Sequence, residues 1–134
     1  MKKVYMGILV LLAVISMVGC GKTESEEQKV EQKYQSVSMG ELEELLNTEE
    51  NSILVDVRTE EEFAQGHIPG AICIPNETIG DNAISELPDE EQTVFVYCRS
   101  GNRSKQAAAK LAALGYSNIV ESGGILDWDG ELEE

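Results

Sequence analysis

The chain is poor in basic residues and in the side chains that usually bind metals. Its 134 residues carry 10 lysines and arginines against 25 aspartates and glutamates, which gives a formal net charge of −15. Because such a surface repels polyanions, we expect no nucleic-acid partner. The sequence has one histidine, His67, and its three cysteines form no CxxC pair. Zinc sites need clustered Cys and His ligands, so we expect no metal, and no motif indicates another cofactor.

Long uncharged runs are also scarce, and the longest one lies near the start of the chain. Lys2 and Lys3 precede an uncharged run over residues 4–19, a pattern typical of a secretory signal. The run is shorter than the ~20 residues that span a bilayer comfortably, although an uncleaved signal anchor is the alternative. Its end at Cys20 resembles the signal of bacterial lipoproteins. The resemblance implies a signal peptide over residues 1–19, a lipid on Cys20, and attachment to the bacterial cell membrane on its extracytoplasmic face or in the periplasm.

The rest of the chain divides into a tether and a domain. Residues 20–36 hold mostly charged and amide side chains after Cys20, leave almost nothing to bury, and therefore predict a flexible acidic tether. Residues 37–134 are long enough for one small domain with a modest core. The acidic surface favours a soluble monomer.

Helix signals recur along the domain. Ser38 with Glu41 and Thr59 with Glu62 are two capping boxes, each of which predicts the start of a helix. Residues 79–87 allow one or two further helical turns.

Short apolar runs alternate with these helices. Such runs are typical of strands that are buried on both faces, as in a parallel sheet covered by helices. The alternation predicts an α/β domain with three α/β/α layers around a small central parallel sheet. The predicted strands cover residues 52–57, 71–74, 93–97 and 118–120.

The third of these strands runs directly into a loop that combines a cysteine with two arginines and a glycine. An alanine-rich helix follows at once, so backbone amides and the helix N-terminus converge on one point and favour an anion there. Ligands of parallel sheets bind beyond the carboxyl ends of the strands. We therefore expect Cys98 to be a nucleophile in a loop that binds a small anion, with Ser104 as the N-cap of the helix. The loop consists of Cys98, Arg99, Ser100, Gly101, Asn102, Arg103 and Ser104.

Three blocks of sequence, in order, resemble the rhodanese family over essentially all of residues 37–128. The resemblance implies a single-domain, thiosulfate-using member with the rhodanese-like fold. The blocks are Asp56-Val57-Arg58 with Glu61-Glu62-Phe63 and Gly66-His67-Ile68-Pro69-Gly70-Ala71, the loop from Tyr97 to Ser104, and Gly123-Gly124 with Trp128.

The same resemblance implies a sulfurtransferase. Cys98 would take a sulfane sulfur from a small anion such as thiosulfate, become a persulfide, and pass the sulfur to a thiol or cyanide. Residues 99–104 would bind the substrate, with Arg103 in contact with it and Arg99 setting the preference for an acceptor. Attack by a thiolate and departure of an anion both benefit from the loop's donors.

Two other functions remain open. A rhodanese-like module at the cell surface could bind sulfane sulfur or a partner without turnover. A phosphatase or arsenate reductase of the cysteine type needs five residues between the nucleophile and the arginine, whereas four separate Cys98 from Arg103. Loop length therefore favours sulfur transfer.

Three residues outside the loop have candidate roles. Arg58 ends a strand at the same rim as Cys98 and is expected to support the site, held by Glu62. His67 is expected to shape its turn rather than move protons. Cys73 is expected to pack in the core, and a redox-active disulfide with Cys98 is the alternative.

Overall fold

The computed structural model describes residues 33–134. The expected signal peptide at 1–19, the lipid on Cys20 and most of the tether at 20–36 lie outside the described residues. Within residues 33–134, no helix is both long enough and apolar enough to cross a membrane.

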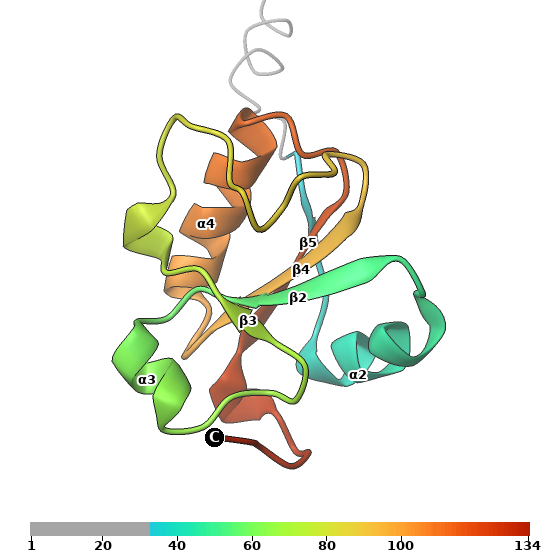
Figure 1. The fold of residues 1–134 in the computed structure, drawn as a ribbon. Coiled ribbons are helices and arrows are strands. Elements are labelled where there is room, and N and C mark those ends of the chain that lie inside the picture. The colour runs from blue at the N-terminus through green and yellow to red at the C-terminus, as the bar shows by residue number, and fades with distance from the viewer. Residues whose placement is uncertain (1–32) are drawn as a thin grey trace, which may run out of the picture. The chain divides into compact units, whose positions relative to one another are not determined.

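The centre of the molecule is a five-stranded parallel sheet with the strand order β1-β5-β4-β2-β3 (Figure 1). Every pair of neighbouring strands is parallel, which confirms the expected α/β class and its small central sheet. The strands are β1 (Gln35–Ser36), β2 (Ser52–Asp56), β3 (Ile72–Cys73), β4 (Thr93–Cys98) and β5 (Ile119–Gly124).

Both capping boxes open helices, as the sequence predicts. Ser38 and Glu41 exchange side-chain hydrogen bonds with each other's backbone amides at the start of α2, and Thr59 and Glu62 do the same at the start of α3. The helices are α2 (Met39–Thr48), α3 (Glu60–Ala64) and α4 (Asn102–Ala113), with short 3-10 helices η1 (Asn76–Thr78) and η2 (Ile125–Asp127).

The prediction of one or two helical turns at residues 79–87 is wrong. This segment forms bends and turns after η1, although Ile79 and Leu87 are still buried. Gly80 weakens a helix there, and Leu87 precedes a proline, which disfavours the helical conformation. The apolar residues of the segment fill the core from a loop.

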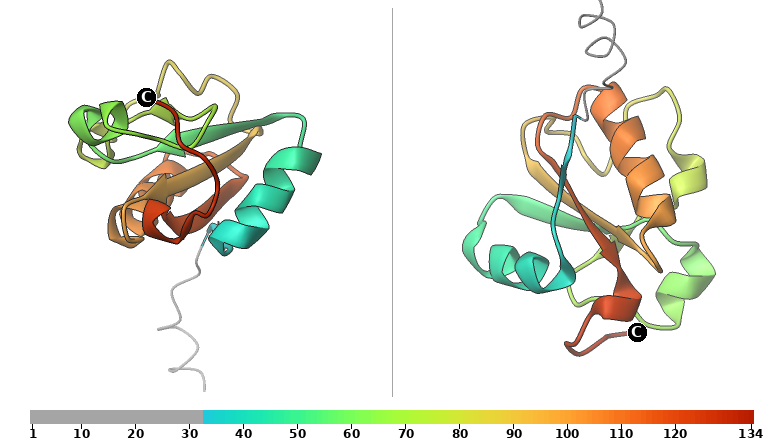
Figure 2. Two further views of the ribbon diagram at one scale, coloured as in Figure 1. Left: turned by 90° about the horizontal axis from the view of Figure 1, so that it is seen from below. Right: turned by 180° about the vertical axis from the view of Figure 1, so that it is seen from behind.

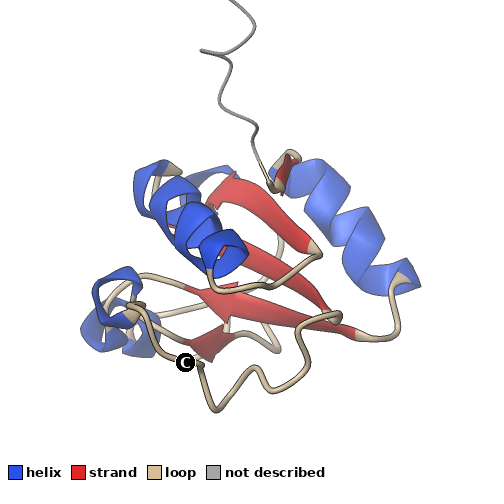
Figure 3. Ribbon diagram, turned by 90° about the horizontal axis from the view of Figure 1, so that it is seen from above, coloured by secondary structure: helices blue, strands red, loops and turns tan. Residues whose placement is uncertain are grey.

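Helices cover both faces of the sheet, which gives the expected three layers. Figure 2 and Figure 3 show α4 on one face and α2 on the other. Successive side chains of a strand point to opposite faces of the sheet, so they pack alternately against α4 and α2. Val94 and Val96 pack with Ala107 and Leu111 of α4, whereas Phe95 and Tyr97 pack on the other face with Leu42 of α2.

The sheet begins before the predicted domain boundary at residue 37. Gln35 and Ser36 pair with Val120 and Glu121 of β5, and Tyr34 packs against the core. These positions belong to the segment expected to be tether. Because the core clusters lie between Tyr34 and Trp128, a chain that lacks residues 1–20 retains every residue of the core, and we expect it to fold.

Candidate active site

The candidate nucleophile lies at the carboxyl end of the central strand. Cys98 is the last residue of β4 and is 1% exposed. The loop after it leads into α4, which begins at Asn102. Gly101 precedes the helix with φ 108°, a left-handed conformation that favours glycine. This short connection places Cys98 directly beneath the helix N-terminus, as the sequence predicts.

The thiol is held by the loop's own backbone. The Gly101 amide donates a hydrogen bond to Cys98 Sγ at 2.9 Å, and Ser104 Oγ lies 3.5 Å from the same sulfur. An amide directed at sulfur stabilises negative charge on it, and the partial positive charge of the first turn of α4 acts in the same direction. The arrangement suits a thiolate or another sulfur anion at this position.

The close approach of β5 to the loop requires glycine. In the sheet, Cys98 is paired with Gly124 of β5. A Cβ atom at Gly124 would overlap the carbonyl group of Arg99, so no other residue fits without movement of the backbone. Leu126 then donates its amide to the Arg99 oxygen at 3.2 Å, which fixes the outer side of the loop.

Ser104 is not the helix N-cap that the sequence predicts. Gly101 occupies the cap position, and Ser104 lies inside the first turn of α4, fully buried. Its hydroxyl lies 2.6 Å from Glu121 Oε1 and 2.9 Å from the Gly101 oxygen. The shorter contact is to a carboxylate and marks the preferred acceptor. Ser104 therefore supports the loop from below.

Glu121 is a buried residue of the site that sequence reasoning missed. Its side chain lies in β5, the residue is 2% exposed, and Oε1 accepts hydrogen bonds from both Ser104 and the Gly123 amide at 2.8 Å. It thus joins α4 to the Gly123-Gly124 segment beneath the thiol. The available signal was its position: Glu121 is a lone charge in a strand that begins Ile119-Val120.

Arg103 forms an ion pair with Glu62 of α3. Its two terminal nitrogens lie 2.7 Å and 3.1 Å from the two carboxylate oxygens, a bidentate geometry. The hydrogen bond from Arg103 is the main reason that the pKa of Glu62 falls to about 2. The same carboxylate accepts from the Thr59 amide in the capping box. Arg103 remains partly exposed beside the loop, where it can still meet an anion.

Arg58 takes a different partner from the one expected. It pairs with Asp56, with Nη2 2.6 Å from Oδ2, and also donates to the Gly66 oxygen at 2.7 Å. Arg58 is 6% exposed. Glu62, the predicted partner, is instead bound to Arg103. Arg58 therefore holds the strand end and the Gly66 turn together.

The remaining loop side chains face solvent. Arg99, Ser100 and Asn102 are exposed, and within residues 33–134 no hydrogen bond or ion pair engages their side chains. The structure thus separates the predicted substrate-binding residues into two groups. Gly101, Arg103 and Ser104 are anchored, whereas Arg99, Ser100 and Asn102 are available on the outside.

His67 contributes to the turn before β3. Its ring stacks on Phe63 with the centroids 3.6 Å apart, and Nδ1 lies 2.9 Å from the Phe63 oxygen. On its other side, Nε2 lies 3.3 Å from Glu133 Oε1. These contacts fit the expected structural role.

Cys73 lies on the edge strand β3 and is half-buried, so the expectation that it packs in the core is wrong. Burial is the main factor that raises the pKa of its thiol to about 11. The register places Asp56 between Cys73 and Tyr97, so Cys73 lies two strand spacings, about 10 Å, from β4. A disulfide needs Cα atoms closer than about 7 Å. Both thiols are free, and the geometry disfavours their pairing.

Metal chemistry has no evident site in this part of the chain. Across residues 33–134, no three histidine, cysteine, aspartate or glutamate side chains are grouped so that they could hold a metal ion. The described site consists of a thiol, backbone amides and arginines. Such a set can bind a small anion and attack it with sulfur.

Known proteins resemble this chain in sequence and fold. Residues 38–131 match the family model of the rhodanese-like domain. The thiosulfate sulfurtransferase PspE of Escherichia coli is 38% identical over 73 residues, which cover 54% of this chain and 70% of PspE. A sulfurtransferase of Allochromatium vinosum is 45% identical over 80 residues, 59% of this chain and 73% of that protein. The structure of the human single-domain sulfurtransferase TSTD1 superposes with a TM-score of 0.57 at 33% identity, covering 66% of this chain and 88% of TSTD1.

The ion pair of Glu62 should show itself in the pH dependence of stability. A carboxyl group with a lowered pKa stabilises the fold above its ordinary pKa, and this stability is lost as pH falls from about 5 toward 2. The side chains of Arg103 and Glu62 are 27% and 29% exposed. Because solvent screens such a pair, we expect Glu62→Gln to lower the free energy of unfolding by only about 1 kcal/mol at pH 7. Urea denaturation should show this gap closing at low pH. Glu61→Gln, at an exposed neighbouring position, is the control, and a gap independent of pH would contradict the pairing.

Glu121→Ala removes the acceptor shared by Ser104 and the Gly123 amide. Because both donors are then left without this partner in a buried place, we expect the free energy of unfolding to fall by about 2 kcal/mol. Chemical denaturation measures the loss. Glu131→Ala makes the same change at an exposed position and should have little effect. Equal stability of the two variants would show that the buried carboxylate contributes nothing.

Proposed function

This chain belongs to the family of rhodanese-like domains, and from that premise we propose that it is a sulfurtransferase acting through a persulfide on Cys98. The observation that supports this most directly is the 2.9 Å hydrogen bond from the Gly101 amide to Cys98 Sγ at the start of α4. Relatives named as sulfurtransferases support the same reaction class.

In the first half-reaction, the Cys98 thiolate attacks the outer sulfur of thiosulfate. A new S–S bond forms at Sγ, the S–S bond of thiosulfate breaks, and its electron pair leaves with sulfite. The negative charge that develops on the departing sulfite needs stabilisation. We expect the loop amides and the partly exposed Arg103 to supply it. The product on the protein is a Cys98 persulfide.

In the second half-reaction, a thiol or cyanide attacks the outer sulfur of that persulfide. The S–S bond to Cys98 breaks, its electrons return to Sγ, and the sulfur leaves on the acceptor. Because Cys98 holds the sulfur between the two half-reactions, ping-pong kinetics are expected. Arg99, Ser100 and Asn102 face outward around the loop, where an acceptor must approach.

The test uses the chain that lacks residues 1–20, with thiosulfate and cyanide as substrates. We expect thiocyanate to form, and mass spectrometry after thiosulfate alone to find the chain one sulfur atom heavier. Cys98→Ser should abolish both signals, because serine provides no sulfur to hold the transferred atom. Cys73→Ser, which changes the other thiol of the domain, should retain both. A wild-type chain that gives neither product would favour the binding module without turnover.

We further propose that the protein is exported and anchored by a lipid on Cys20. The support is the charged start, the uncharged run over residues 4–19 and the cysteine that follows it. Lipid attachment would keep the domain near the membrane surface.

Labelling bacterial cells that express the full chain with radioactive palmitate tests the anchor. We expect the label in the wild type and in Cys73→Ser, and none in Cys20→Ser, since the acylated thiol is then missing. A Cys20→Ser protein that stays equally membrane-bound would instead favour an uncleaved signal anchor.

A further inference from the structure

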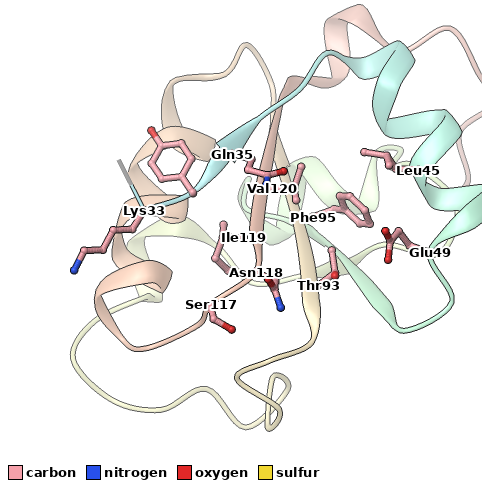
Figure 4. Close-up of a pocket in the computed structure, with 11 residues that line it drawn as sticks. Lys33, Gln35, Leu45, Glu49, Thr93, Phe95, Ser117, Asn118, Ile119 and Val120 are labelled. Atoms are coloured by element: carbon pink, nitrogen blue, oxygen red, sulfur yellow. The ribbon is translucent and has the colours of Figure 1, made fainter. Parts of the chain in front are cut away.

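A pocket of about 390 Å³ lies on the outer side of the active-site loop. We call it the loop-side pocket. Arg99 lines one part of it, and Ile125, Leu126 and Leu132 line another. A second cavity, of about 430 Å³, lies at the amino ends of β4 and β5, where Thr93 and Asn118 line it (Figure 4). Because Cys98 is at the carboxyl end of β4, the loop-side pocket, which Arg99 lines, is nearer to the nucleophile than this second cavity is.

The chain connectivity fixes how near the loop-side pocket is to Cys98. Arg99 follows Cys98 directly, so their Cα atoms are about 3.8 Å apart. Ile125 follows Gly124, the residue paired with Cys98 across the sheet. The Leu126 amide also binds the Arg99 oxygen at 3.2 Å. Two walls of the pocket therefore begin directly after the paired residues Cys98 and Gly124, one at Arg99 and the other at Ile125.

The apolar wall is exposed to an unusual degree. Leu126 and Leu132 are 64% and 52% exposed, and among the described residues they are the two exposed large hydrophobic side chains. Both line this one pocket. Apolar side chains that gather at one exposed place are typical of binding surfaces.

Leu132 is held in place by the segment around it. His67 and Glu133 exchange two backbone hydrogen bonds of 2.9 Å. The Leu132 side chain lies next to Gly66, where a Cβ atom would contact it. Figure 2 shows this C-terminal segment beside α3. These backbone hydrogen bonds hold Leu132 at its place in the apolar wall.

The charges of the loop-side pocket leave one cation without a partner. Arg58 and Glu62 also line this pocket, but Arg58 is bound to Asp56 and Glu62 is paired with Arg103. Arg99 is exposed and has no carboxylate partner within residues 33–134. A ligand of this pocket therefore meets an apolar wall and a single available positive charge.

We propose that the loop-side pocket binds the sulfur acceptor, and that this acceptor is a small thiol with an aliphatic chain and a carboxylate. The inference rests on the proposed sulfur transfer. The chain packs against Leu126 and Leu132, the carboxylate pairs with Arg99, and the thiol faces the persulfide of Cys98. Its thiolate forms an S–S bond with the outer sulfur, the bond to Sγ breaks with the electrons left on Sγ, and the thiol proton passes to water.

The chemistry of the walls favours this acceptor over the simple ones. Cyanide and short neutral thiols can react at Cys98, but they offer nothing to Leu126 or Leu132. A long neutral thiol uses the apolar wall alone, and a short thiol carboxylate uses Arg99 alone. Only a molecule with both features uses the whole pocket.

Discharge of the isolated persulfide tests the proposal. The chain lacking residues 1–20 is loaded with thiosulfate, desalted, and mixed with 6-mercaptohexanoate, 6-mercaptohexanol, 3-mercaptopropionate or 2-mercaptoethanol. These thiols vary the chain and the charge independently. We expect 6-mercaptohexanoate to discharge Cys98 with a second-order rate constant about threefold above that of 6-mercaptohexanol, as for one exposed charge contact. Equal constants for these two would overturn the role of Arg99.

Variants assign the preference to its residues. Arg99→Gln should reduce the ratio of the constants for 6-mercaptohexanoate and 6-mercaptohexanol toward one, whereas Lys105→Gln, an equal charge change outside the pocket, should preserve it. Leu126→Ser with Leu132→Ser should slow both long thiols several-fold relative to the short ones. An unchanged chain-length preference in that double variant would overturn the apolar wall. Failure to load the persulfide at all would instead contradict the proposed function.

Discussion

The close contact between β5 and the active-site loop is the constraint on which the site depends. Gly124 stands opposite Cys98 in the sheet, and the space for a side chain there is already filled by the carbonyl of Arg99. The loop can therefore turn within a few residues and enter α4 directly. Its amide then reaches Cys98 Sγ, and the carbonyl of Arg99 becomes available to the Leu126 amide. Backbone contact, rather than side-chain packing, sets the position of Cys98.

The arginines near Cys98 differ in their surroundings, although the protein as a whole is acidic. The formal net charge of −15 repels anions at long range. Near Cys98, three arginines have three different environments. Arg58 is buried against Asp56, Arg103 is paired with Glu62 and partly exposed, and Arg99 is exposed. Arg58 therefore stabilises the fold, and Arg103 adds positive charge beside the loop after Cys98. Arg99 gives the loop-side pocket its available positive charge.

Local signals in the sequence predicted most of the fold. The capping boxes of α2 and α3 and the apolar strands around the sheet depend on neighbours within a few residues, and they occur as predicted. The errors at the candidate site have long-range causes. Glu62 takes its partner from a residue 41 positions away, Ser104 is directed to Glu121 by a neighbouring strand, and Cys73 is placed on an edge by the strand order. A sequence pattern without three-dimensional pairing cannot distinguish these outcomes.

Glu62 serves two parts of the molecule with one carboxylate. It completes the start of α3 with Thr59 and holds Arg103 at the active-site loop. Positions 59, 62 and 103 therefore form one unit of selection, although they lie on separate segments of the chain. A substitution at residue 62 disturbs both the start of α3 and the loop after Cys98. In diverging relatives with this geometry, the three positions should change together, and a pairwise covariation between 62 and 103 should be the trace that this constraint leaves.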